Sequence, residues 1–244
     1  MKSSKEVTLK KVNVPTKSRI DKQCKSDASL ILNPMALRDQ VYEYLREEII
    51  AGRIEGERVN LNVLSETLAV SKTPLRDALI RLSAEGFVTI LPRHGIIIKS
   101  LTREEARNFF QIIAVFEGEV LREVFGNLDP IKIDKMILIT AAMRRVIGFD
   151  SFSFYYNLDL SFHNIFLDLT PNDRLRTLVS LMKQQLFSFL RNDYQEAREF
   201  LNCDEHDEIV DCLRKRNVGG AVKILKDAHW CFGNKSFHPS TRRQ

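Results

Sequence analysis

Three short helical patterns followed directly by two β-rich stretches constrain the fold of this chain more than any other feature of its sequence. In the first pattern, apolar residues recur at the spacing of one helical face, and Gly52 can end the helix. These apolar residues are Leu37, Val41, Tyr44, Leu45 and Ile49. A second helix is expected over about 63–68. A third begins at Ser71, which suits an N-cap, and continues to Gly86.

Two stretches rich in β-forming residues come immediately after the third helix. They cover residues 87–91 and 96–99, and the turn sequence PRHG joins them at residues 92–95. Because its glycine can supply a positive φ, this arrangement predicts a β-hairpin. Three helices followed by a hairpin are the outline of a winged helix-turn-helix.

A different pattern begins at Thr102. Thr102 and Glu105 have the spacing of a capping box, which starts a new helix with almost no linker after the hairpin. Six amphipathic helical segments follow, with no strand pattern between them. The expected breaks lie at Gly126, at Asp129 and Pro130, at Gly148 with Asp150, at Pro171 and Asn172, at residues 202–204, and at Gly219 and Gly220. The expected fold class is therefore mainly α: an N-terminal winged helix-turn-helix with a small β-hairpin wing, followed by an all-α antiparallel helical bundle.

The composition is that of a soluble protein, with 44% hydrophobic and 28% charged residues. No apolar run approaches the roughly 20 residues that a membrane helix needs, so we expect no membrane partner and a cytoplasmic location. The four cysteines (Cys24, Cys203, Cys212 and Cys231) form no CxxC pair, which favours free thiols. The net charge of +5 equals that of residues 1–30, which carry eight Lys or Arg and three Asp or Glu.

The N-terminal end of the third helix concentrates groups that can contact DNA. Ser71, Lys72, Thr73 and Arg76 lie there. In a helix-turn-helix this end enters the major groove, where hydroxyls meet phosphates and basic side chains reach guanine. An ordinary capped surface helix is the alternative, but a hairpin directly behind the helix supplies a second contact surface. The pattern thus favours a double-stranded DNA operator as partner.

This region resembles the GntR family of bacterial transcription regulators. The resemblance covers residues 37–99 and rests on GRIEGERVN and on LAVSKTPLRDALIRLSAEGFVTILPRHGIII. It implies contact with the operator through two sets of residues. These are Ser71, Lys72, Thr73 and Arg76 on the helix, and Arg93, His94 and Gly95 at the wing. We expect the chain to read a two-fold operator as a homodimer. The chain departs from the family at Lys72, where Arg is usual, and at Asn62, where a backbone-contacting Arg is common.

Four residues of the second half have the chemistry of metal ligands. Asp159 and His163 are four residues apart, so their side chains share one face of a helix. His206 and His229 can come from two further helices, and a surface Asp–His pair without metal is the alternative. A rival Cys2His2 zinc site would use Cys203, His206, His229 and Cys231. We reject it because helical residues two apart, such as His229 and Cys231, point about 200° from one another.

The second half also resembles the ligand-binding domain of the FadR-like (FCD) subfamily, on LDLSFHNIF, DEHDEIVDCL and GGAVKILKDAHW. This resemblance implies that Asp159, His163, His206 and His229 bind a divalent ion, with zinc or nickel expected. It also implies a small organic-acid effector. The family commonly has an Arg four residues before the position of Glu117, where this chain has Ile113. That Arg would bind the carboxylate of the effector, and the arginines that could replace it here are Arg144, Arg174, Arg191 and Arg198.

These features predict a metal-containing, effector-responsive DNA-binding regulator. We expect a basic arm over 1–33, a DNA-binding domain over 34–100, an effector-binding and dimerisation domain over 101–237, and a polar tail over 238–244. A metal-dependent hydrolase-like enzyme is the alternative class, but the chain has no HExxH, P-loop or GxGxxG to support it. A DNA-binding protein with a purely structural metal is a third hypothesis.

Overall fold

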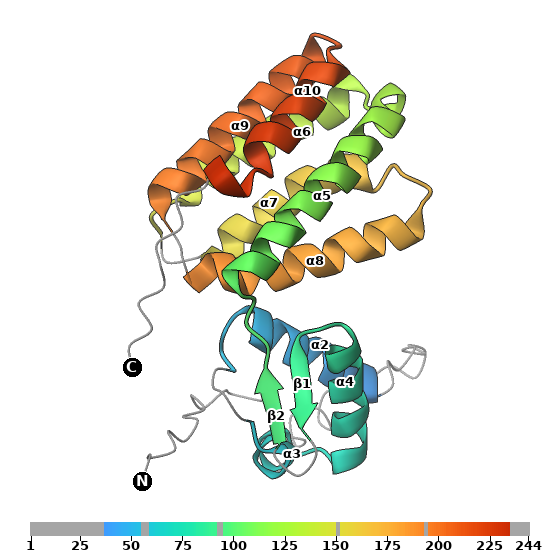
Figure 1. The fold of residues 1–244 in the computed structure, drawn as a ribbon, viewed down its shortest axis with the longest axis vertical. Helices are drawn as coiled ribbons and strands as arrows, with labels where there is room; N and C mark the ends of the chain where they lie inside the picture. The colour runs from blue at the N-terminus through green and yellow to red at the C-terminus, as the bar shows by residue number, and fades with distance from the viewer. Residues whose placement is uncertain (1–36, 55–58, 92–94, 150–151, 193–194, 235–244) are drawn as a thin grey trace, which may run out of the picture. The chain divides into compact units, whose positions relative to one another are not determined.

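The computed structural model describes residues 37–54, 59–91, 95–149, 152–192 and 195–234 (Figure 1). The chain divides into two compact units, at residues 1–100 and 101–244. The described residues contain no helix whose length and apolar character would let it cross a membrane.

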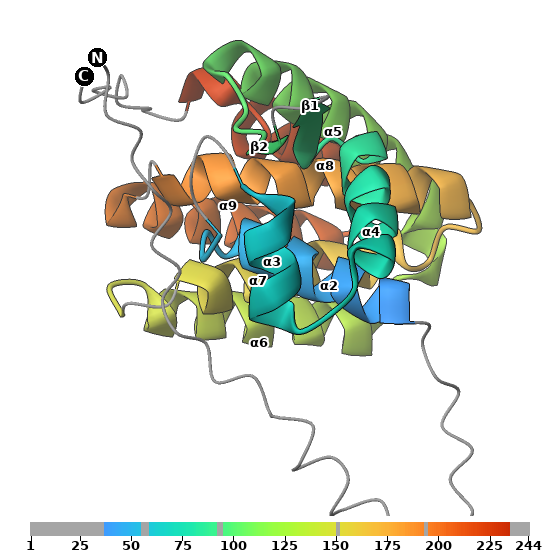
Figure 2. The ribbon, with the colours of Figure 1, turned by 90° about the horizontal axis from the view of Figure 1, so that it is seen from below.

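In its described residues, the first unit contains three helices and a two-stranded sheet (Figure 2). Its elements are α2 (Leu37–Ile50), α3 (Leu61–Leu68), α4 (Lys72–Ala84), β1 (Val88–Leu91) and β2 (Gly95–Ile98). The strands pair antiparallel, with Val88 opposite Ile98, and an isolated bridge from Val59 to Ile96 extends the sheet. Helix α2 packs on α4, which confirms the predicted winged helix-turn-helix arrangement of three helices and a hairpin.

The buried face of α2 differs from the predicted one. Tyr42 is buried, whereas Tyr44 is half-buried and Leu37 is 51% exposed. Tyr42 can be buried because its hydroxyl donates to Glu85 over 2.5 Å and the Arg81 guanidinium lies 3.6 Å from the centre of its ring. Burial and the Glu85 carboxylate raise the pKa of Tyr42 to about 12, so this hydroxyl stays a donor and ties α2 to the end of α4.

Six α-helices form the second unit in the described residues. They are α5 (Arg103–Val124), α6 (Pro130–Val146), α7 (Phe152–Leu167), α8 (Asp173–Asn192), α9 (Glu196–Arg214) and α10 (Val218–Ile224). A 3-10 turn η1 (Phe125–Asn127) follows α5, a π-helical turn η2 (Leu225–His229) follows α10, and a 3-10 turn η3 (Phe232–Asn234) comes last. The predicted capping box is confirmed, since Thr102 Oγ1 accepts from the Glu105 amide over 3.1 Å and the Thr102 amide donates back over 2.8 Å. Helix α5 contacts α7, α8 and α10.

Two predicted helix breaks were wrong. Residues 202–204 lie inside α9, because Cys203 and its neighbours on that face pack into the bundle core. Gly219 and Gly220 lie inside α10, whose N-cap Asn217 accepts from the Gly220 amide over 2.9 Å. A Cβ at Gly220 would lie 2.5 Å from Asn217 Nδ2, so glycine permits this cap and does not break the helix.

Candidate functional site

Four predicted ligands converge in the second unit. One oxygen of Asp159 and one ring nitrogen of each of His163, His206 and His229 lie within 4.8 Å of one another. The Nε2 atom of His163 is 3.1 Å from that of His229 and 3.4 Å from that of His206. Asp159 Oδ1 is 3.7 Å from His206 Nε2 and 4.0 Å from His163 Nε2. All four residues are buried.

Local structure explains why these side chains point inward. Asp159 and His163 are one helical turn apart on the buried face of α7, and His206 lies on the buried face of α9. His229 ends the π-helical turn η2, in which the backbone is wound more loosely than in α10. Such turns often occur at functional sites, because the extra residue changes the direction of the side chains that follow.

Two carboxylates face the far sides of the imidazole rings. His229 Nδ1 forms a 3.0 Å hydrogen bond with Glu205 Oε2, and His163 Nδ1 lies 2.8 Å from Glu117 Oε2. A carboxylate partner favours the proton on Nδ1 and leaves Nε2 as the coordinating atom. The second layer of contacts therefore orients both rings toward the centre of the cluster.

Glu117 is the hub of this second layer. Its side chain is fully buried, and its Oε2 accepts from Trp230 Nε1 over 2.7 Å. Its Oε1 pairs with Lys183 Nζ, and Lys183 is 2% exposed. Lys183 is not among the residues predicted from the sequence, although its place on the apolar face of α8 with Val179 and Leu186 was a usable signal.

The donor set fits a transition-metal ion. Three neutral imidazoles and one carboxylate are ligands that zinc and nickel accept. With metal–nitrogen bonds of about 2.0–2.1 Å, neighbouring ligand atoms stand roughly 3–3.5 Å apart, close to the Nε2 separations seen here. Among the described residues no other group of His, Cys, Asp or Glu has a comparable arrangement. In particular, Cys203 and Cys231 lie outside the group.

A small inner cavity of about 30 Å³ adjoins two of the ligands, Asp159 and His229. Its other polar walls are Arg198 and Glu199, which pair over 3.1 Å, and Asn202. Tyr155 and Tyr156 line it as well, and burial raises the pKa of both well above the usual value, so their hydroxyls stay protonated. This space is on the order of one or two water molecules.

The structure distinguishes the four candidate arginines. Arg198 is 6% exposed and lines the inner cavity. Arg144 instead bridges α6 to α9 at the surface, 2.6 Å from Asp204 and 2.7 Å from Asp207. Arg174 is exposed, and Arg191 is half-buried but does not line the cavity.

The predicted DNA-reading residues lie together at the start of α4. Ser71, Lys72, Thr73 and Arg76 are all exposed. The turn before them is held by Ser65 Oγ, which donates to the Val70 carbonyl over 2.6 Å, and by Ala69 at a φ of 52°. Arg93 and His94 lie outside the described residues. Gly95 has a φ of 90°, and a Cβ there would lie 3.1 Å from the Val59 carbonyl, so its position in the sheet requires glycine.

Two family profiles match the chain. The profile of the bacterial regulatory proteins of the gntR family covers residues 37–98, and that of the FCD domain covers residues 108–228. The chain belongs to the GntR family. It is a DNA-binding transcriptional regulator with an FCD domain, and not an enzyme.

Named relatives of this GntR-family chain are regulators too. It is 23% identical to the HTH-type transcriptional repressor RspR of Escherichia coli over 81% of this chain and 88% of that protein. It is 25% identical to the gluconate operon transcriptional repressor of Bacillus licheniformis over 74% of this chain and 77% of that protein. Two solved structures share the fold with a TM-score of 0.66. McbR/YncC of E. coli is 17% identical in sequence, and the match covers 79% of this chain and 92% of that protein. A GntR regulator from Rhodococcus sp. RHA1 is 19% identical, and the match covers 82% of this chain and 98% of that protein.

Replacing Lys183 should show how far the Glu117 hub depends on its cation. Lys183→Met leaves a buried carboxylate without its ion-pair partner, so we expect the free energy of unfolding of the second unit to fall by about 3–5 kcal/mol. Trp230, the only tryptophan, reports this unfolding by fluorescence in urea. The double variant Glu117→Gln/Lys183→Met removes both charges and should regain most of the loss. Equal losses in the two variants would contradict this account.

Proposed function

We propose that the FCD domain of this regulator binds one divalent metal ion, zinc or nickel, through Asp159, His163, His206 and His229. The observation that carries the proposal is the approach of four buried donor atoms to within 4.8 Å of one another. Side chains this polar are costly to bury together unless they bind something. Glu117 and Glu205 support the proposal because they hold two of the imidazoles with Nε2 directed inward.

We further propose that a small organic acid is the effector and that its carboxylate enters the inner cavity. When bound, the ion would offer open coordination positions to a carboxylate. Arg198 is the cation that lines this cavity. It would replace the arginine that the family commonly has at the position of Ile113. Because Glu199 already pairs with Arg198, the incoming acid would compete with a carboxylate of the chain itself. Aromatic walls and the small volume favour a compact acid.

DNA reading is assigned to the start of α4 in a homodimer. Lys72 and Arg76 are exposed where a recognition helix meets the major groove, and a two-fold dimer would read two half-sites about one helical turn apart. The effector acts only if it binds the DNA-competent and incompetent forms of the dimer unequally. A purely structural metal remains the second candidate, supported by the complete burial of His163 and His206.

Metal content tests the proposed ligands directly. His163→Ala, prepared without a histidine tag, should hold at least about tenfold less zinc or nickel than the wild type, because a ligand and its second-layer contact are both lost. Mass spectrometry of both proteins after identical reconstitution measures this. His238→Ala, in the predicted tail, is the matched control and should bind metal normally. Equal metal in His163→Ala and wild type would refute the site.

Gel-shift titration tests the recognition helix. Arg76→Ala should cost about 1–3 kcal/mol of specific operator binding, since it removes a charged contact to a base or phosphate. Arg122→Ala, an exposed arginine of the second unit, serves as control. A scrambled duplex measures nonspecific binding. Unchanged affinity of Arg76→Ala for the operator would show that this side chain does not read DNA.

Effector binding can be tested through Arg198. Acetate, lactate and citrate are titrated into metal-loaded protein by calorimetry. Arg198→Gln should bind the preferred acid about tenfold more weakly or worse, because it loses a charge-assisted contact. Its metal content should stay normal, since Arg198 is not one of the four proposed ligands and pairs with Glu199 and with the Leu190 carbonyl. Normal acid affinity in Arg198→Gln would rule out its role as anchor. If Arg144→Gln lowers the affinity for the acid as much as Arg198→Gln does, the loss is a nonspecific effect of charge.

A further inference from the structure

A second and larger hollow, the outer groove, lies on the surface of the second unit. It encloses about 660 Å³, within the range of roughly 300–1,000 Å³ that small-molecule sites occupy. It shares the rings of Phe110 and Trp230 with the inner cavity, and these rings meet edge to face at 5.5 Å. No metal ligand lines the outer groove.

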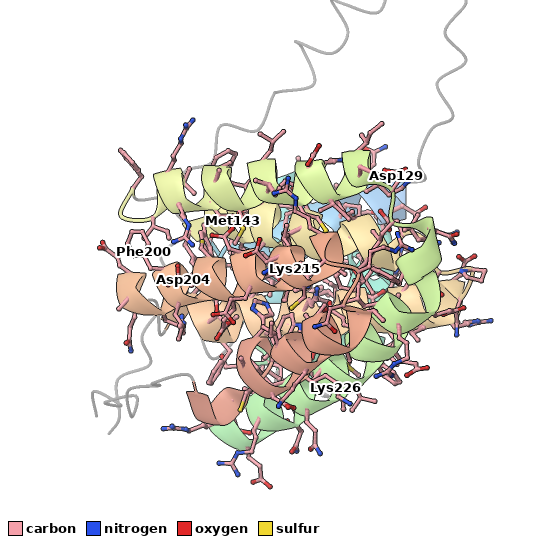
Figure 3. All side chains as sticks on the ribbon, turned by 90° about the horizontal axis from the view of Figure 1, so that it is seen from above. Asp129, Met143, Phe200, Asp204, Lys215 and Lys226 are labelled. Atoms are coloured by element: carbon pink, nitrogen blue, oxygen red, sulfur yellow. The ribbon has the colours of Figure 1, made fainter. Side chains whose placement is uncertain are left out.

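Two segments form the walls of the outer groove. One wall is an exposed face of α5 with residues at helical spacing: Arg103, Arg107, Gln111 and Val115. The other wall comes from the end of the described chain, where Lys226 and Asp227 precede the aromatic residues Trp230 and Phe232. The Lys226 side chain lies against α5 (Figure 3).

The groove combines positive charge with an aromatic surface. Three cations line it, against one acidic side chain, Asp227. The guanidinium carbons of Arg103 and Arg107 lie 5.7 and 5.6 Å from the centre of the Phe232 ring. Both arginines therefore lie over one aromatic side chain, which is itself almost buried.

The positions of these arginines are unfavourable for the helix alone. Like charges four residues apart repel each other on a helix face. Positive charge in the first turns also opposes the helix dipole, whose positive end is at the N-terminus. Arg103 has both features, since it is the first residue of α5, although Glu104 and Glu105 supply negative charge in the same turn, and Arg107 lies one turn further along the helix. A bound anion would reduce the repulsion between the two arginines.

We propose that the outer groove is a binding site for an organic anion with an aromatic body, at a place distinct from the proposed metal centre. The carboxylate would lie between Arg103 and Arg107, whose planar guanidinium groups suit paired hydrogen bonds to its two oxygens. The ring of the ligand would pack on Phe232 and Trp230. Nothing in this site requires the ion or the effector of the inner cavity.

Trp230 connects the two sites and gives the groove a signal. Its ring lines the outer groove, while its Nε1 donates to Glu117, which faces His163. A ring that packs on Trp230 changes the surroundings of the only tryptophan in the chain. Occupation of the groove is therefore visible as a change in protein fluorescence.

Benzoate is the probe for this site, titrated into the full-length protein and followed by calorimetry and tryptophan fluorescence. We expect saturable binding that survives removal of metal by a chelator. The double variant Arg103→Gln/Arg107→Gln should bind at least about tenfold more weakly, since it loses two charge-assisted contacts. Arg122→Gln, on the same helix but outside the groove, is the matched control and should bind as the wild type does. Thermal unfolding verifies that each variant is folded.

Other outcomes overturn the proposal. If the wild type does not bind benzoate, or if the double variant binds it normally, the groove is not an anion site. If Arg198→Gln or chelation abolishes binding, the probe occupies the inner cavity. If neutral benzyl alcohol binds as tightly as benzoate, the arginines contribute nothing. Metal analysis of the same samples is separate, so a protein that binds benzoate but no metal would refute the metal site and leave the groove intact.

Discussion

The buried carboxylate of Glu117 is the group on which the second unit depends. A charge without solvent is tolerated only where partners surround it, and here Lys183, His163 and Trp230 supply them. These partners come from α8, α7 and the segment after α10, while Glu117 itself lies on α5. One polar contact set thus fixes four parts of the chain in a single arrangement.

Residues 225–233 contribute to the Asp159–histidine cluster, to the contacts of Glu117 and to the outer groove. The π-helical turn of this segment places His229 beside Asp159, His163 and His206, and the next residue, Trp230, donates to Glu117. Lys226, Asp227 and Phe232 of the same segment line the outer groove. Because neighbouring residues contribute to the Asp159–histidine cluster and to the groove, movement of this segment would affect both.

Local patterns predicted much of the fold. The capping box at Thr102 and the pairing of Asp159 with His163 depend on residues three or four apart, which meet whenever a helix forms. The predicted breaks at 202–204 and at Gly219 and Gly220 failed for the opposite reason. Burial of one face carries α9 through residues with weak helix preference, and the cap at Asn217 places both glycines inside α10.

The sequence by itself determined the two-part architecture and the residue types of the ligand cluster, because periodicity, capping and ligand chemistry are local properties. Only the tertiary structure decided which distant charges meet. It selected Arg198 from four arginines for the inner cavity, and it placed Lys183, which no sequence argument had singled out, against Glu117. Electrostatic pairing falls steeply with distance and strengthens on burial, and both depend on how the helices pack. Helix packing brings together residues 66 positions apart in Glu117 and Lys183, and no local pattern encodes that encounter.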